Sequence, residues 1–312
     1  MPAIVRFWVA VLGAGALSAG LYLMVTLGST GALVLAYIAQ LPLFLVGLSV
    51  GLTASALAGA LAAVMTLALH GIPIAAIFVI AFLLPVLVLV RQALLSRRNE
   101  AGAMEWYPPG LLAGWLVGIG IAITAASILF LALSGGAEAS VRAFVGKVFD
   151  AARAALPGGT PPMGRDQVID MMAGYLPGVA LGSLLIMTAL NAVLAQGVLM
   201  RFGANLRPSP DIAALELPVA FVAIFAGTLA AGAVLPGDLG YLARNLAPVV
   251  LIGGALAGLA VVHTAVRKLD ARTWMLVAVY LAAALLVWPI ILLAAVGMAE
   301  PFLKLRRRLA GV

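Results

Sequence analysis

A small set of polar side chains interrupts the apolar blocks of the chain, and these residues have the clearest capacity for chemistry. They are Tyr37, Gln40, Asn191, Gln196, His263, Thr264 and Tyr280. Burying an amide or hydroxyl group in an apolar environment is costly unless it forms hydrogen bonds. We expect Gln40, Asn191 and Tyr280 to contact a ligand. Hydrogen bonding between helices is the alternative, above all for Asn191 and Gln196.

Ionisable groups that could support catalysis or proton transport are missing from the middle of these blocks. No Asp, Glu, Lys or Arg lies there, although proton-driven carriers commonly use a membrane-embedded carboxylate. Cysteine is absent, His70 and His263 fall in different blocks, and the sequence contains no hydrolase, phosphate-loop or zinc-protease motif. The sequence therefore predicts no enzyme activity, no metal site and no cofactor.

The elements that must position these polar residues are membrane-spanning helices. Hydrophobic residues make up 65% of the chain and charged residues only 9%, which a water-soluble globule could not accommodate. About nine blocks approach the roughly 20 residues that a helix needs to cross a bilayer. They fall near residues 7–28, 32–51, 53–69, 72–90, 109–134, 171–200, 217–235, 246–266 and 273–298. We expect an all-α, polytopic transmembrane helical bundle of about eight to nine membrane segments, forming a single integral membrane domain over residues 1–312.

One polar insert, residues 135–170, separates the fifth and sixth blocks. Apolar residues recur within it at helical spacing: Val141, Phe144, Val145, Val148, Phe149, Ala152 and Leu156. Charged residues occupy the other face, which predicts an amphipathic helix over residues 138–156 that lies at the membrane interface and stops at PGGTPP. This helix either braces the bundle or forms a lid over a cavity.

The net charge of +7 comes from basic residues in the short gaps between apolar blocks, where they set membrane topology. Neither a basic base-reading helix nor an aromatic RNA-binding stretch is present, so we expect no binding to nucleic acid. If all nine blocks cross, the 18 Lys and Arg residues divide as nine against nine. Moving only the basic tail to the other side gives thirteen against five, the bias expected of a cytoplasmic face. We therefore expect a cytoplasmic C-terminus, with residues 273–303 entering the membrane and returning through a break at Pro289.

Small residues at four-residue spacing allow the close helix contacts that drive packing in lipid. Ala10, Ala14 and Ser18 form such a stripe in the first block, and Gly254 and Gly258 form another in the eighth. Internal packing is the simplest interpretation of each stripe. The alternative is that a stripe docks another membrane protein subunit, a partner in addition to the lipid bilayer itself.

Four short stretches carry a resemblance to a known family: LPLFLVGLSVG, WYPPG, LELP and GMAEPFLKLRRR. Together they resemble the YybS-like family of predicted bacterial membrane proteins, over most of the chain. Such proteins are similar to the substrate-binding subunits of energy-coupling-factor vitamin transporters. This likeness implies a helical bundle in the bacterial cytoplasmic (inner) membrane, with both termini cytoplasmic and a coupling partner docked on Ala10, Ala14 and Ser18. The chain departs from those subunits in having more than six apolar blocks and no recognisable ligand signature.

Two functions of different classes follow from these observations. The first is a ligand-binding or transport subunit, with a cavity between the early helices and the insert helix over its mouth. The second is a membrane scaffold or regulatory partner without transport activity, whose small-residue stripes and basic tail contact other proteins or anionic lipid. An enclosed polar cavity would favour the first function and a solid bundle the second. The sequence specifies neither the ligand nor the partner nor the oligomeric state.

Overall fold

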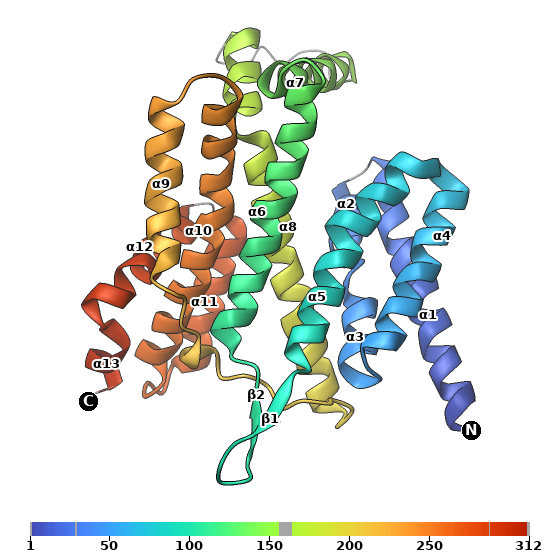
Figure 1. Cartoon of the computed structure of the whole chain (residues 1–312), viewed down its shortest axis with the longest axis vertical. Helices are drawn as coiled ribbons and strands as arrows, with labels where there is room; N and C mark the ends of the chain where they lie inside the picture. The colour runs from blue at the N-terminus through green and yellow to red at the C-terminus, as the bar shows by residue number, and fades with distance from the viewer. Residues whose placement is uncertain (1, 29, 156–163, 287, 311–312) are drawn as a thin grey trace. The chain divides into compact units, whose positions relative to one another are not determined.

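The fold is almost entirely helical in the computed structural model, which describes residues 2–28, 30–155, 164–286 and 288–310 (Figure 1). Tertiary contacts divide the chain into two compact units. Unit 1 comprises Met1–Leu116 and Leu184–Glu216, and unit 2 comprises Val117–Ser183 and Leu217–Val312. Two helices belong partly to each unit, and the single membrane domain expected over residues 1–312 stays a prediction.

Unit 1 is built mainly from five helices and parts of the two shared ones. These helices are α1 (Ala3–Leu23), α2 (Thr30–Tyr37), α3 (Leu41–Ser49), α4 (Leu52–Ile77), α5 (Leu84–Ala93), the start of α6 (Pro109–Leu133) and the end of α8 (Arg165–Arg201). The other elements of unit 1 are the 3-10 turns Met24–Leu27 and Ile212–Ala214, the π-helical turn Phe78–Leu83, and an antiparallel hairpin of β1 (Ser96–Arg98) and β2 (Met104–Trp106).

The predicted third and fourth blocks form one helical stretch that doubles back on itself. Gly71 interrupts it with φ 77° and ψ −178°, a conformation that glycine adopts readily, and Pro73 follows. The Leu83 side chain lies where a Cβ atom on Gly59 would stand. In a straight helix these two residues would be roughly 36 Å apart, at 1.5 Å per residue. The stretch Leu52–Ala93 is therefore a helical hairpin, although by length and composition it counts as a single candidate span.

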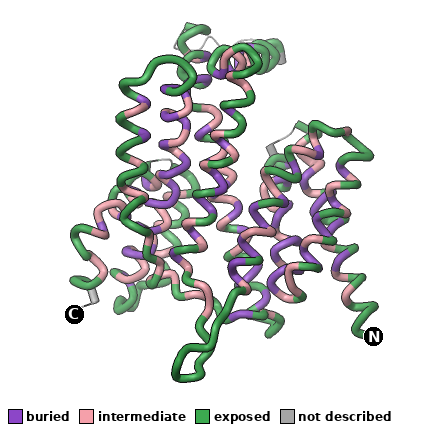
Figure 2. The backbone as a smooth tube through the Cα atoms, in the orientation of Figure 1, coloured by how far each residue is buried: buried purple, intermediate pink, exposed green. Residues whose placement is uncertain are grey.

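Unit 2 contains the remaining helices. They are α7 (Ala137–Ala155), α9 (Ala220–Val234), α10 (Gly237–Val266), α11 (Arg272–Leu285), α12 (Trp288–Leu303) and α13 (Leu305–Ala310), together with the end of α6 and the start of α8. Figure 2 shows buried positions along much of α10, which is the central helix of this unit.

The stripe at Gly254 and Gly258 packs α10 against α12 within the chain. A Cβ atom on Gly258 would overlap the backbone of Leu293, and one on Gly297 would overlap the carbonyl oxygen of Gly254. Only residues without side chains allow two helix backbones to approach so closely. The structure therefore supports internal packing for this stripe.

Six helices among the described residues are long and apolar enough to cross a membrane, or seven if the bent pair α11 and α12 counts as one span. The predicted all-α class of a multi-pass membrane protein is confirmed, whereas the predicted number of eight to nine segments is not. The bend between α11 and α12 is 116° and falls between Leu285 and Trp288, just before Pro289. Figure 1 shows α13 at the same lower end of unit 2 as the turn after α10, the arrangement that the charge count favours.

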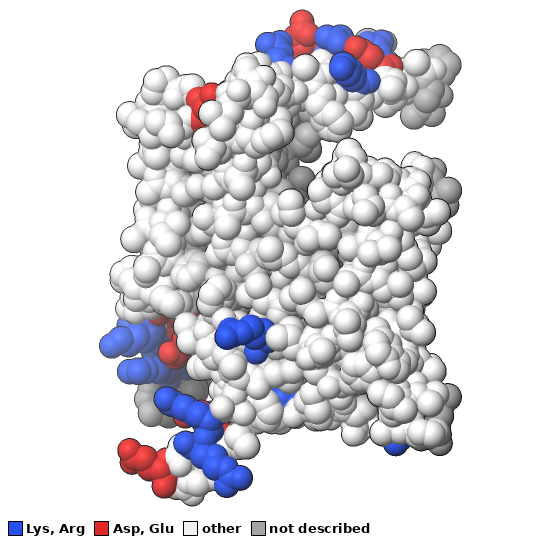
Figure 3. All heavy atoms as spheres, turned by 45° about the vertical axis from the view of Figure 1, so that its right-hand side comes forward, with Lys and Arg blue, Asp and Glu red and all other residues white. Residues whose placement is uncertain are grey.

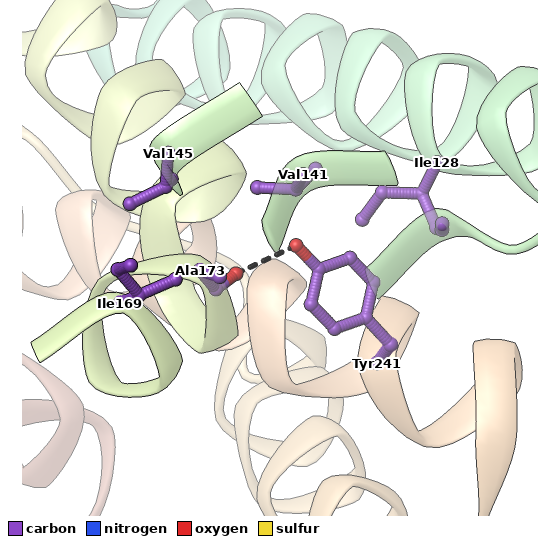
Figure 4. Packing of buried hydrophobic residues seen from close by; sticks show 7 residues of the cluster. Ile128, Val141, Val145, Ile169, Ala173 and Tyr241 are labelled. Carbon is purple, nitrogen blue, oxygen red and sulfur yellow. Dashed lines mark hydrogen bonds between the residues drawn. The ribbon is translucent and has the colours of Figure 1, made fainter. Parts of the chain in front are cut away.

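The polar insert forms α7, which begins one residue before the predicted helix over residues 138–156. Val141 and Val145 are buried against Ile128 and Ile169, as Figure 4 shows. Two other residues of the predicted apolar face, Phe144 and Val148, are exposed. Leu156 and the PGGTPP stop lie outside the described residues. Only part of the predicted apolar face is therefore buried by protein, and α7 is not among the helices apolar enough to cross a membrane.

Candidate functional site

The predicted site residues Gln40 and Asn191 both lie at an interruption between α2 and α3. Pro42 causes this interruption, because it has no N–H group to donate to Ile38 and its ring clashes with that carbonyl group. The Leu41 N–H instead donates to the Ile38 carbonyl oxygen, three residues back, at 3.0 Å. The chain thus passes from α2 to α3 through a tight turn over residues 38–40.

Side chains from distant helices donate to the carbonyl groups of this turn. Ser18 Oγ on α1 donates to the Ala39 carbonyl oxygen at 2.7 Å, and Asn191 Nδ2 on α8 donates to the Tyr37 carbonyl oxygen at 2.8 Å. Gln40 Nε2 in the turn donates to the Phe82 carbonyl oxygen of the π-helical turn at 3.1 Å. A proline-broken helix is tolerated at membrane depth when neighbouring groups satisfy its backbone in this way.

Two acceptor atoms remain without a donor after these bonds form. They are Gln40 Oε1 and Asn191 Oδ1, and both are buried. Asn191 Nδ2 also donates to the Met187 carbonyl oxygen at 2.7 Å. Because every partner of the two amide NH₂ groups is a carbonyl oxygen, neither amide can be turned round without losing its bonds, and the two oxygens must face elsewhere.

The chemistry of this α2–α3 site is that of a hydrogen-bond acceptor. Gln40 and Asn191 are 1% and 2% exposed, so their oxygens stand in a low-dielectric interior where an unmet hydrogen bond is costly. The described contacts of both amides are to backbone carbonyl groups and include no carboxylate, imidazole or amine. This arrangement can bind a group that donates hydrogen bonds, but it offers no nucleophile or general base.

Tyr280, the third predicted ligand-binding residue, belongs to unit 2. Its hydroxyl group lies 3.1 Å from Nε2 of His263, and the side chain is partly exposed. Gln40 and Asn191 therefore share one interruption in unit 1, whereas Tyr280 forms a separate pair with His263. Its ligand-binding role stays a prediction.

The stripe of Ala10, Ala14 and Ser18 lies along the side of α1 that is partly covered within unit 1. Ser18 is fully buried, and Ala10 and Ala14 are half-buried. Gly15, next to Ala14, packs so tightly on α4 that an added Cβ atom would lie 2.6 Å from the Ala58 carbonyl oxygen. Of the three stripe residues, Ser18 therefore packs inside unit 1.

A buried arginine at one end of unit 1 is a feature that the sequence did not reveal. Arg207 Nη1 donates to the Ala93 carbonyl oxygen at 2.9 Å, and the guanidinium group lies over the ring of Trp106. Gln196, a polar residue noted in the sequence, donates from Nε2 to the Arg207 carbonyl oxygen at 2.8 Å. Burial lowers the pKa of the Arg207 guanidinium group. The partial negative charge at the C-terminal end of α5 stabilises this cation in place of a carboxylate.

A proline inside α8 of unit 2, which continues as one helix from Arg165 to Arg201, was also missed. Pro177 cannot donate to the Ala173 carbonyl oxygen, and the Tyr241 hydroxyl group donates to that oxygen at 2.8 Å (Figure 4). Asn245 Oδ1 accepts from the Gly178 N–H at 2.9 Å, and Asn245 Nδ2 donates to the Gly174 carbonyl oxygen at 3.1 Å. The sequence does contain a signal for this contact, because Pro177 lies within the sixth apolar block. A proline there leaves a carbonyl oxygen without its helical donor, so a side chain on a neighbouring helix must donate instead.

The α7 helix is fixed to unit 2 by polar contacts at both ends. Asp238 accepts a hydrogen bond from the Ala137 N–H at 2.8 Å. Further ion pairs are Glu138 with Arg244, Arg142 with Asp170, and Asp150 with Arg165. Figure 3 shows basic and acidic side chains side by side at the top of the view, the end of the molecule at which Figure 1 shows α7. The Arg165 guanidinium holds the pKa of Asp150 below its ordinary value. These contacts favour the interpretation that α7 braces the helical bundle over the alternative that it forms a lid above a cavity.

A shallow groove of about 430 Å³ lies between α7 and the start of α8. Its lining includes Ala139, Ala143, Gly146 and Ile169, with Arg142 and Arg165 among the charged residues of its wall. Both arginines are already paired with carboxylates, whereas the α2–α3 site has two buried amide oxygens without donors. No group of three or more His, Asp or Glu side chains capable of holding a metal ion occurs within the described residues.

Comparisons with known proteins identify the family of the chain. No curated protein and no solved structure matches it. A family model described as a predicted membrane protein matches residues 16–300, and this agrees with the YybS-like resemblance. The match covers most of the chain and extends over both units, so the protein belongs to this family of predicted membrane proteins, DUF2232.

Proposed function

We propose that the protein is a ligand-binding or transport subunit of the bacterial cytoplasmic membrane and that its ligand binds at the α2–α3 site. The observation that carries the proposal is the pair of buried amide oxygens on Gln40 and Asn191 that lack donors at an interrupted helix. Interrupted helices at membrane depth recur as substrate sites in transporters, because their polar groups are held in place by surrounding protein.

The unmet groups indicate the chemical class of the ligand. Both are neutral acceptors, so the complementary ligand is a small, uncharged molecule that presents at least two O–H or N–H donors. Leaving a buried acceptor unsatisfied costs about 1–3 kcal/mol, and a ligand that donates to both oxygens recovers this free energy on binding. A polar vitamin-like molecule, as the likeness to energy-coupling-factor subunits implies, has suitable donors. The proposal assigns no catalytic role to any residue.

The scaffold alternative receives less support from the same helices. Ser18 donates its hydroxyl group to the Ala39 carbonyl oxygen inside unit 1, so it is not on a face that a second subunit could contact. In the proposal the lipid bilayer covers the exposed apolar faces, and a coupling subunit would use a surface other than Ser18.

The test is to identify small molecules that co-purify with the full-length protein in native lipid, by mass spectrometry. The wild-type protein is compared with Gln40→Met and Asn191→Leu, and with Gln92→Met as a matched control. Gln92 is another buried amide of unit 1 whose Oε1 atom lacks a partner, but it lies at the C-terminal end of α5.

We expect a donor-bearing molecule in the wild type and in Gln92→Met, and at least a tenfold loss in Gln40→Met and Asn191→Leu. Unfolding temperatures measured in parallel show whether each variant is folded. Equal retention in all four proteins, or no co-purifying molecule in any of them, would show that the proposal is wrong.

A further inference from the structure

The C-terminal segment has a charge pattern that depends on one buried ion pair. The Glu300 carboxylate accepts a hydrogen bond from Arg306 Nε at 3.0 Å, and the Arg306 backbone N–H lies 3.3 Å from both carboxylate oxygens. The two side chains are 10% and 15% exposed. Glu300 therefore neutralises Arg306 and holds the first turn of α13 against the end of α12.

The turn between α12 and α13 leaves Lys304, Arg307 and Arg308 exposed on the surface. Lys304 has φ 50° and is the sole non-glycine residue with positive φ in the described part of the chain. This left-handed conformation is unfavourable for a residue with a Cβ atom, so surrounding contacts must maintain it. The Lys304 N–H donates to the Glu300 carbonyl oxygen at 2.9 Å. Glu300 thus contacts both Lys304 and Arg306 and fixes the direction of α13.

Three cations are exposed as a result, and exposed apolar side chains lie next to them. Lys304, Arg307 and Arg308 are exposed and form no ion pair within the described residues. The apolar residues of this surface are Phe302, Leu303 and Leu309, which are 63%, 46% and 48% exposed. A short segment with free cations and exposed large apolar residues matches the membrane interface, where headgroups and acyl chains meet.

We propose that this tail surface, defined as residues 302–309, binds the phosphate groups of anionic phospholipids. The three free cations complement the headgroup charge, and Phe302 and Leu309 reach the acyl region. Free phosphate offers the same charge but no apolar part, so the exposed apolar residues favour lipid as the source. The surface is independent of the α2–α3 site.

The test measures lipids retained by the full-length protein, by native mass spectrometry after exchange into an equal mixture of phosphatidylglycerol and phosphatidylcholine. The variant Arg307→Gln/Arg308→Gln removes two exposed cations from the tail surface. The matched control Lys147→Gln/Arg153→Gln removes two exposed cations from α7.

Each basic residue near an anionic membrane surface contributes about a fivefold factor in affinity, so we expect the tail variant to lose roughly 25-fold in phosphatidylglycerol enrichment. The α7 control should change less than twofold. Raising the salt concentration should weaken retention by the wild type. Equal losses in the two variants, or displacement of the lipid by millimolar inorganic phosphate, would overturn the proposal.

Discussion

Units 1 and 2 each contain a helical stretch with an internal proline, and they differ in how fully the polar groups around that proline are hydrogen-bonded. In unit 2, Tyr241 supplies the donor that Pro177 lacks, and both polar atoms of the Asn245 amide are used. In unit 1, Ser18 and Asn191 donate to carbonyl groups near Pro42, and Gln40 donates to the Phe82 carbonyl oxygen. The amides of Gln40 and Asn191 nevertheless keep oxygens without a donor.

The same contrast holds for the units as wholes. Four buried side-chain atoms in the described part of the chain lack a hydrogen-bond partner, and all four belong to unit 1: Gln40 Oε1, Gln92 Oε1, Asn191 Oδ1 and Arg207 Nε. Buried polar atoms without hydrogen-bond partners lower the stability of a protein. Their concentration in unit 1 is therefore expected if selection there has favoured a function over stability. No such atom occurs among the described residues of unit 2, and the proposed ligand site lies in unit 1.

The largest expected effect is at Pro177 in α8, where the neighbouring polar groups are hydrogen-bonded. Asn245→Leu keeps the approximate volume but removes the contacts to Gly178 and Gly174, and we expect it to lower the free energy of unfolding by about 2–4 kcal/mol. The measurement is thermal or denaturant unfolding of the purified protein in a mild detergent. A loss below about 0.5 kcal/mol would mean that the helix satisfies its own backbone at Pro177, and the contrast between the units would then disappear.

Tyr241→Phe should have the next largest effect, about 1–2 kcal/mol, because it leaves the Ala173 carbonyl oxygen buried without a donor. The double variant Tyr241→Phe/Pro177→Ala gives residue 177 an N–H group that can donate to the same oxygen. We therefore expect the double variant to recover most of the lost stability. Additive losses in the same unfolding assay would contradict this account of the break.

The sequence singled out the buried amides of unit 1 but not Tyr241 and Asn245 of unit 2, for a physical reason. Gln40 and Asn191 stand inside apolar blocks, where any polar residue is conspicuous because its burial is costly. Tyr241 and Asn245 precede the predicted eighth block, which was assigned to residues 246–266, yet α10 begins at Gly237 and buries both. Which donor reaches a carbonyl group freed by proline depends on helix contacts between distant segments, and periodicity carries no information about these.

The number of membrane segments was harder to predict than their character. Composition and the lengths of the apolar blocks indicated an all-α membrane protein, and the periodicity of the insert located the start of α7 to within one residue. The chain changes direction at Gly71, between the predicted third and fourth blocks, and just before Pro289, where the sequence also predicted a break. Hydropathy reports the length of an apolar stretch but not whether it passes through or turns back.

Asn191→Leu tests the unit 1 break and should cost less than Asn245→Leu, about 1 kcal/mol or below. The Tyr37 carbonyl oxygen loses a donor, but the unpartnered Oδ1 atom is removed at the same time, so the two effects largely offset each other. The same unfolding assay, run side by side on the two Asn→Leu variants, provides the comparison. If Asn191→Leu is as destabilising as Asn245→Leu, then Asn191 has a structural role equal to that of Asn245.

The smallest expected change in stability is for Gln40→Met. This substitution removes a 3.1 Å hydrogen bond to the Phe82 carbonyl oxygen together with a buried oxygen that has no donor. Methionine is flexible enough to fill the vacated space, so the free energy of unfolding should change by about 1 kcal/mol or less, in either direction. A residue kept only for stability would give a clear loss, whereas a binding residue can be replaced without one. A loss above about 2 kcal/mol in unfolding experiments would instead assign Gln40 to the structure of the α2–α3 turn, and the difference between the two units would then be one of packing alone.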